Sequence, residues 1–88
     1  MRSKEAYGAI RKALASNPRT SIVECNYDTA AFGNFLIAFE ADGEPKSVVN
    51  DRGELVLCGD LAGTRNCETV VPSINDVNER IILKTLGL

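Results

Sequence analysis

The chain has 88 residues, enough for one domain with a modest core and with little room for a deep active-site cleft. Its 44% hydrophobic and 25% charged residues are typical of a globular domain and argue against intrinsic disorder. The formal net charge is −2, histidine is absent, and we expect neither a signal peptide nor a membrane span, because no apolar run is long enough.

The first expected element is a helix over residues 3–16, with Ser3 as its N-cap. Apolar residues recur along it at spacings of three and four, which predicts one buried stripe with the basic residues on other sides. Asn17-Pro18 ends this helix, because proline disfavours helical backbone at the residue before it.

Short strands separated by turn residues are expected next, over residues 20–27, 34–40, 46–49, 54–58 and 67–71. The turns are indicated by Asp42-Gly43 and by the segment from Asn50 to Gly53, since these residue types tolerate a positive φ. The strand over 34–40 has apolar residues on both faces, which predicts a central position covered on both sides.

A second helix is expected from an N-cap at Ser73 to a C-cap at Gly87, with Asp76 and Arg80 paired one turn apart. Its apolar residues fall on two sides. The first helix or the chain end covers the second side, or that side is an exposed ridge through which copies of the chain associate, formed by Ile82, Leu83 and Leu86.

The order of these elements predicts an α+β fold and a single domain over residues 1–88. Four to five consecutive strands form an antiparallel meander, and the N-terminal and C-terminal helices pack on one of its faces (α-β-β-β-β-β-α).

No catalytic residue, metal site or cofactor is predicted. The absence of histidine removes the commonest general base and the commonest metal ligand. The cysteines, Cys25, Cys58 and Cys67, are an odd number without paired spacing, so we expect buried thiols and a cytoplasmic location. A disulfide between Cys58 and Cys67 stays open as an alternative that needs an oxidising compartment.

The charges are unevenly distributed along the chain. Residues 1–20 carry five basic side chains and one acidic one, a net +4, whereas residues 21–60 carry eight acidic and two basic ones, a net −6. The leading hypothesis is therefore a non-enzymatic module that binds a protein with a basic surface, as small inhibitors, immunity proteins, antitoxins and phage-borne accessory proteins do. The acids expected to make this contact, at the hairpin tips, are Asp42, Glu44, Asp51, Glu54 and Asp60.

The alternative hypothesis is a nucleic-acid-binding domain that uses the basic N-terminal segment. Phosphate contacts would come from Arg2, Lys4, Arg11, Lys12 and Arg19. The net negative charge, and a content of two tyrosines and three phenylalanines, make this the second choice.

Overall fold

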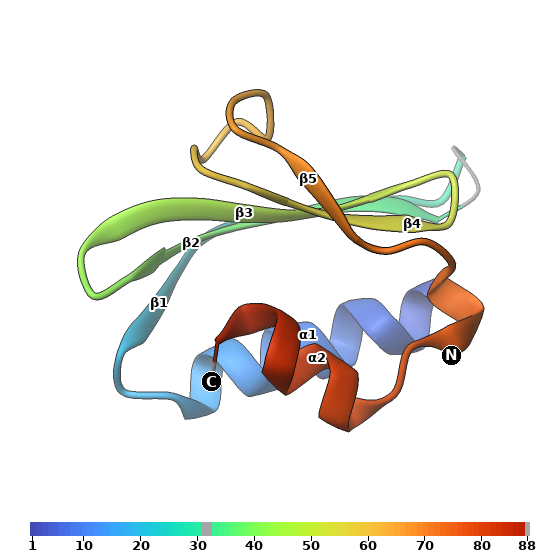
Figure 1. The fold of residues 1–88 in the computed structure, drawn as a ribbon, viewed down its shortest axis with the longest axis horizontal. Coiled ribbons are helices and arrows are strands. Elements are labelled where there is room, and N and C mark those ends of the chain that lie inside the picture. Colours follow the sequence, from blue (N-terminus) through green and yellow to red (C-terminus); the bar gives the residue numbers. More distant parts are fainter. Residues whose placement is uncertain (31–32, 88) are drawn as a thin grey trace.

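Two helices cover one face of a five-stranded antiparallel sheet (Figure 1). The computed structural model describes residues 1–30 and 33–87, and it confirms the predicted α+β class, the meander and the placement of the helices. The sheet order is β1-β2-β3-β4-β5. The elements are α1 (Ser3–Ser16), β1 (Thr20–Asp28), β2 (Asn34–Ala41), β3 (Glu44–Asp51), β4 (Glu54–Cys58), β5 (Glu68–Val71), a 3₁₀ turn η1 (Ile74–Asp76) and α2 (Glu79–Leu86).

The core lies between α1 and the middle of the sheet. On β2, Phe35, Ile37 and Phe39 face the helices, and all three are almost completely buried. The apolar stripe predicted for α1 packs against them through its buried residues Ala6, Ile10 and Leu14. Burial of each large apolar side chain contributes roughly 1.5–3 kcal/mol, so this layer contributes a large share of the driving force for folding.

A buried polar cluster ties the N-terminus of α1 to two turns of the sheet. Asn50, which is 2% exposed, donates from Nδ2 to Ser3 Oγ at 2.9 Å and to the Gly33 carbonyl at 3.0 Å. Its Oδ1 accepts from the Gly53 amide at 3.1 Å. The sequence places Asn50 in an exposed turn, but the structure extends β3 to Asp51 and points Asn50 inward.

The expected N-cap of the first helix is wrong. Arg2 occupies the N-cap position without a side-chain cap, and Ser3 lies inside the helix, where its hydroxyl donates to the Gly33 carbonyl. The Ser3 hydroxyl therefore bonds to a carbonyl group of the β1–β2 turn and does not cap a free amide of the helix.

The C-terminal helix begins later than the sequence predicts. Ser73 caps only η1, accepting from the Asn75 amide at 3.3 Å, and Val77 returns to extended backbone. Asn78 then caps α2 by accepting from the Ile81 amide at 3.0 Å. Because Asp76 precedes the helix, the expected Asp76–Arg80 pair is absent from the ion pairs of residues 1–30 and 33–87.

The break before α2 also explains why the apolar residues fall on two sides of the single helix that the sequence predicts. The expected helix is divided between two separate elements, η1 and α2. Ile82 is 3% exposed and belongs to the core, and Leu86 packs partly against it, whereas Leu83 is 45% exposed. The predicted C-cap is confirmed, since Gly87 is left-handed with φ of 74°. Of the three residues expected to form an exposed ridge, Leu83 alone projects into solvent.

Replacing glycine with alanine is expected to have opposite effects on stability at two positions, Gly8 and Gly33. A Cβ at Gly8, in the exposed middle of α1, would meet no atom within 4 Å, so Gly8→Ala is expected to raise the free energy of unfolding by about 0.5–1 kcal/mol. Gly33 has φ of 77°, and its Cβ would lie 2.7 Å from Ser3 Oγ, so Gly33→Ala should lower the free energy of unfolding by more than about 1 kcal/mol. Urea unfolding of both variants measures this difference, and equal effects would contradict it.

Candidate acidic docking face

The alternation of side chains along the strands separates apolar from acidic residues. Residues that pair across neighbouring strands share a face of the sheet, and the face opposite the helices carries every second residue of β1–β4. No lysine or arginine occupies these positions in β1–β4. We call this surface the acidic face, and its carboxylates are Glu24, Asp28, Glu40, Asp51 and Glu54.

A hollow of about 280 Å³ lies on the acidic face near the β3–β4 turn. Leu36 and Val49, cross-strand partners that are both half-buried, form its apolar floor. Its polar lining consists of Asn26, Asp28, Asn34, Asn50 and Asp51. An apolar floor bordered by carboxylates suits a lysine or arginine side chain, whose aliphatic stem packs on the floor while its charged head meets the acids.

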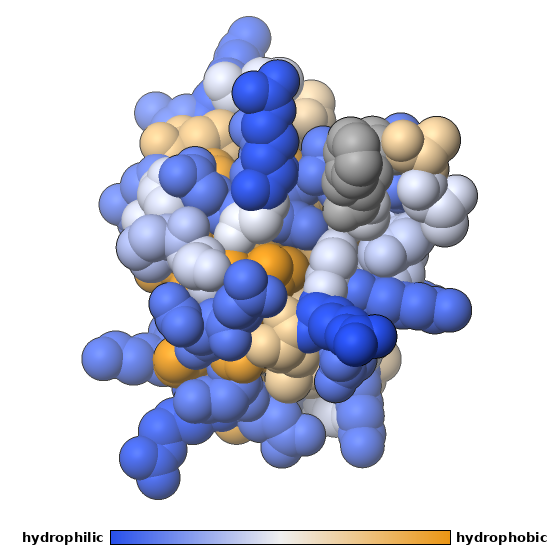
Figure 2. Space-filling view, turned by 90° about the vertical axis from the view of Figure 1, so that its right-hand side faces the viewer, coloured by the Kyte–Doolittle hydropathy of each residue, from blue (hydrophilic) through white to orange (hydrophobic). Residues whose placement is uncertain are grey.

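The end of the molecule beside this hollow is mainly hydrophilic. Seen from the side with the β3–β4 turn and the N-terminus, apolar side chains appear only as small separate patches (Figure 2). This end therefore offers polar and charged contacts and no broad apolar area.

The segment over residues 59–67 forms a wall that stands over the middle of the acidic face, beside the hollow and on the side away from the helices (Figure 1). Gly63 lies so close to the sheet that a Cβ there would be 2.9 Å from Val49 Cγ2 and 3.0 Å from Leu36 Cδ1. Beneath it, Ser47 Oγ is buried and has no hydrogen-bond partner among the described residues. The wall thus protects one end of the apolar floor from water.

Asp60 is the internal support of this wall. Its Oδ1 accepts from the Thr64 amide at 2.9 Å and the Arg65 amide at 3.2 Å, and its Oδ2 accepts from the Thr64 hydroxyl at 2.8 Å. Desolvation raises the pKa of Asp60, but the hydrogen bonds from Thr64, Arg65 and Gly63 together outweigh it and lower the pKa. Both oxygens of its carboxylate therefore accept hydrogen bonds that stabilise the wall.

A disulfide between Cys58 and Cys67 closes the wall, contrary to the expectation of three unpaired thiols. Cys58 ends β4 and Cys67 directly precedes β5, so antiparallel pairing of these strands brings the two side chains together. Cys25 remains a free, half-buried thiol on β1. The cytoplasmic location stays a prediction, and the disulfide weighs against it, since such bonds persist in oxidising compartments.

The five acids predicted from the hairpin tips do not form one surface. Asp51 and Glu54 face each other on the acidic face at the β3–β4 turn. Asp42 and Glu44 lie at the β2–β3 turn, at the opposite end of the sheet, and Asp60 supports the wall. The five predicted acids therefore lie at two opposite ends of the sheet and in the wall, and they do not form one continuous acidic surface.

Asp42 is already paired within the molecule. Arg19 donates from Nε to Oδ1 at 3.1 Å and from its terminal nitrogen to Oδ2 at 2.5 Å, a two-point contact between the start of β1 and the β2–β3 turn. The hydrogen bond from Arg19 lowers the pKa of Asp42 and raises that of Arg19. This contact takes one residue from the predicted acidic set and one from the predicted basic set.

The other four residues of the predicted basic set lie on or just before α1, whereas Arg52 lies in the β3–β4 turn and Arg65 in the wall. Arg2 precedes α1, while Lys4 and Arg11 are exposed on it, with Arg11 placed over the Tyr7 ring at 5.3 Å from its centroid. Lys12 borders a groove between the two helices. The charge asymmetry of the sequence thus becomes an asymmetry between a basic helix layer and an acidic sheet face.

Sequence reasoning missed Glu24, Asp28 and Glu40 as members of the acidic face. The signal was present, because Glu24 and Asp28 alternate with Cys25 and Tyr27, which face the helices. Turn signals direct attention to acids at hairpin tips, whereas acids inside strands resemble ordinary solvated residues. The β-bulge between Ile22 and Glu24 also resets the alternation, which strand pattern alone does not reveal.

Metal-binding clusters are absent from the described residues, and the pKa of Tyr7 is raised. Across residues 1–30 and 33–87, no three cysteine, aspartate or glutamate side chains lie close enough to hold a metal ion. Burial, and then the neighbouring Cys25 thiol, raise the pKa of Tyr7, so its hydroxyl stays protonated. In the same part of the chain neither helix has the length and apolar character needed to cross a bilayer.

Comparison with protein-family models, curated proteins and solved structures found no match to this chain.

The disulfide should contribute substantially to the stability of this small domain. Replacing both Cys58 and Cys67 with serine is expected to lower the free energy of unfolding by about 2–3 kcal/mol, because a closed loop of this length restricts the unfolded chain. Urea unfolding without reductant measures the loss. A reductant should produce a similar loss in the original chain and none in the double variant. Unchanged stability of the original chain under reductant would contradict the assignment.

Proposed function

We propose that this chain is a non-enzymatic protein-binding domain whose acidic face engages a basic surface on another protein. One observation carries the proposal: β1–β4 place five carboxylates and no cation on the face opposite the helices. Helices cover the other side of the sheet, and the 59–67 wall covers only part of this one, so the rest of the acidic face is open to a partner (Figure 1).

The geometry also supports a specific mode of contact. The hollow between Asp28 and Asp51 accepts one long basic side chain, and Glu24 and Glu54 extend the negative charge beyond it. Charges arranged in this way speed the encounter of two proteins and select among partners. An inhibitor, an immunity or antitoxin-type protein and a phage-borne accessory protein are the functional classes that fit such a domain.

The nucleic-acid alternative has fewer residues available than the sequence suggests. Arg19 is held by Asp42, which leaves Arg2, Lys4, Arg11 and Lys12 on the helix side. Because phosphate binding requires several free cations, this alternative is the weaker of the two and serves as the second outcome of the test below.

Neutralising three of the five carboxylates on the acidic face should weaken capture of the partner. Tagged protein is used to capture partners from a lysate of the source cell at low and at moderate salt, and captured proteins are identified by mass spectrometry. We expect one stoichiometric basic partner that weakens with salt. The variant Glu24→Gln, Asp51→Asn, Glu54→Gln should reduce its affinity at least about tenfold.

The matched control removes three charges elsewhere, through Glu5→Gln, Glu44→Gln and Asp76→Asn, and should bind as the original chain does. Equal losses in the two variants would show that only net charge matters. Recovery of nucleic acid, lost when Arg11 and Lys12 are replaced with glutamine, would favour the alternative.

A further inference from the structure

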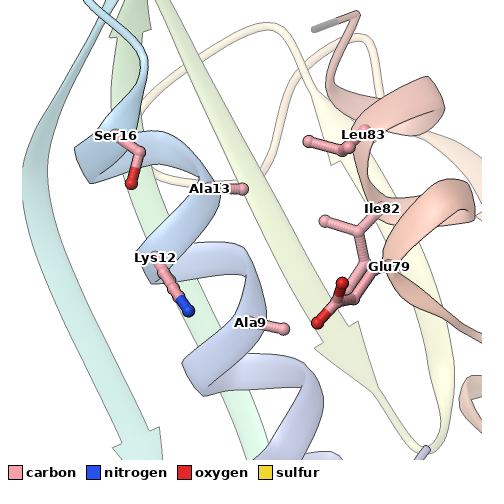
Figure 3. Close-up of a pocket in the computed structure, with 7 residues that line it drawn as sticks. All are labelled: Ala9, Lys12, Ala13, Ser16, Glu79, Ile82 and Leu83. Carbon is pink, nitrogen blue, oxygen red and sulfur yellow. The ribbon is translucent and has the colours of Figure 1, made fainter.

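The helix layer contains a groove between α1 and α2, on the side of the molecule opposite the acidic face. Its volume is about 190 Å³, and Figure 3 shows its two walls. Ala9, Ala13 and Ser16 line it from α1, and Ile82 and Leu83 line it from α2. The two helices therefore do not close against each other over their outer edges.

The walls of the groove are complementary to each other in shape. Ala9 and Ala13, one turn apart on α1, have short side chains that leave a hollow (Figure 3). Leu83 projects from α2 and is 45% exposed, whereas neighbouring Ile82 is buried in the core. One surface thus carries both an apolar projection and a shallow space able to receive one.

The walls are also opposite in charge. Lys12 borders the groove on α1 and Glu79 borders it on α2 (Figure 3). Both are exposed, and neither takes part in an ion pair within the described part of the chain. A partner that sets a cation against Glu79 and an anion against Lys12 would satisfy both.

We propose that a second copy of this chain occupies the groove, in a dimer whose two-fold axis runs parallel to the helices. Such an axis sets α1 of each copy against α2 of the other, since each contact in a two-fold interface occurs twice. Leu83 then packs against Ala13 of the partner subunit, as a knob enters a hole. Lys12 meets Glu79 of the partner subunit at both edges.

The charges favour this axis over a two-fold axis that crosses the groove at a right angle to the helices. A two-fold axis across the groove would set α1 against α1 and bring the two Lys12 side chains together, which is unfavourable. In the proposed dimer the four helices lie between two sheets, and both acidic faces remain exposed on the outside. The dimer and the proposed function are independent of each other, because the two surfaces share no residue.

Self-association is measured by sedimentation velocity and by light scattering during size-exclusion chromatography, at micromolar to millimolar concentrations of the tag-free chain. We expect a monomer–dimer equilibrium. Leu83→Lys should weaken it at least about tenfold, while Val23→Lys, which changes an apolar residue on β1 that is 50% exposed, should leave it unchanged. Circular dichroism verifies that both variants are folded.

A charge exchange provides the sharper test. Lys12→Glu alone and Glu79→Lys alone each place like charges together at both edges, and each should weaken the dimer at least about tenfold. An equimolar mixture of the two variants should recover dimers, because the carboxylate introduced in one variant meets the ammonium group introduced in the other only in the mixed pair. Effects on folding within one chain are not rescued by mixing.

A monomer at every concentration would overturn the proposal and leave the groove to a different partner. Dimers that survive Leu83→Lys, or a mixture no better associated than its components, would also overturn it by showing that another surface is used.

Discussion

The meander has one apolar face, and the packing of two helices on that face is the constraint on which the other features depend. Phe35, Ile37 and Phe39 need a partner layer, and α1 supplies it with the stripe of Ala6, Ile10 and Leu14. Once this side of the sheet is closed, the alternation of side chains sends every other strand residue to the opposite face. The position of the core therefore determines which face of the sheet carries the acidic residues.

Two surfaces with different chemistry result. The outer sheet face is acidic and contains a hollow beside Asp51, while the helix layer is basic and contains a groove that ends in Leu83. The Arg19–Asp42 pair joins the segment after α1 to the β2–β3 turn, so these charges serve the fold. A domain of this size can thus keep one face for a partner and another for a second copy.

The sequence predicts the fold well and the site only in part. Periodicity and turn residues place α1, the strands and their order, because these signals are local. The N-caps of both helices were assigned to the wrong residues, since Ser3 bonds to Gly33, far along the chain, and Asn78 competes with Ser73. In the sequence, Asp42 and Asp60 are indistinguishable, because both are acidic residues in expected turns. Their contacts with Arg19 and with the residue 59–67 segment depend on the register of strand pairing and on the fold of that segment, which local sequence patterns do not reveal.

Amide chemical shifts of the ¹⁵N-labelled chain, followed during titration with a short lysine- and arginine-rich peptide, would locate the docking surface directly. We expect salt-sensitive changes concentrated at Glu24, Asn26, Leu36, Val49 and Asp51, around the hollow of the acidic face. Little change is expected on α1 and α2. Changes that centre on the helices, or that follow Asp42 and Asp60 at the other end, would contradict the claim that the outer sheet face is the docking surface.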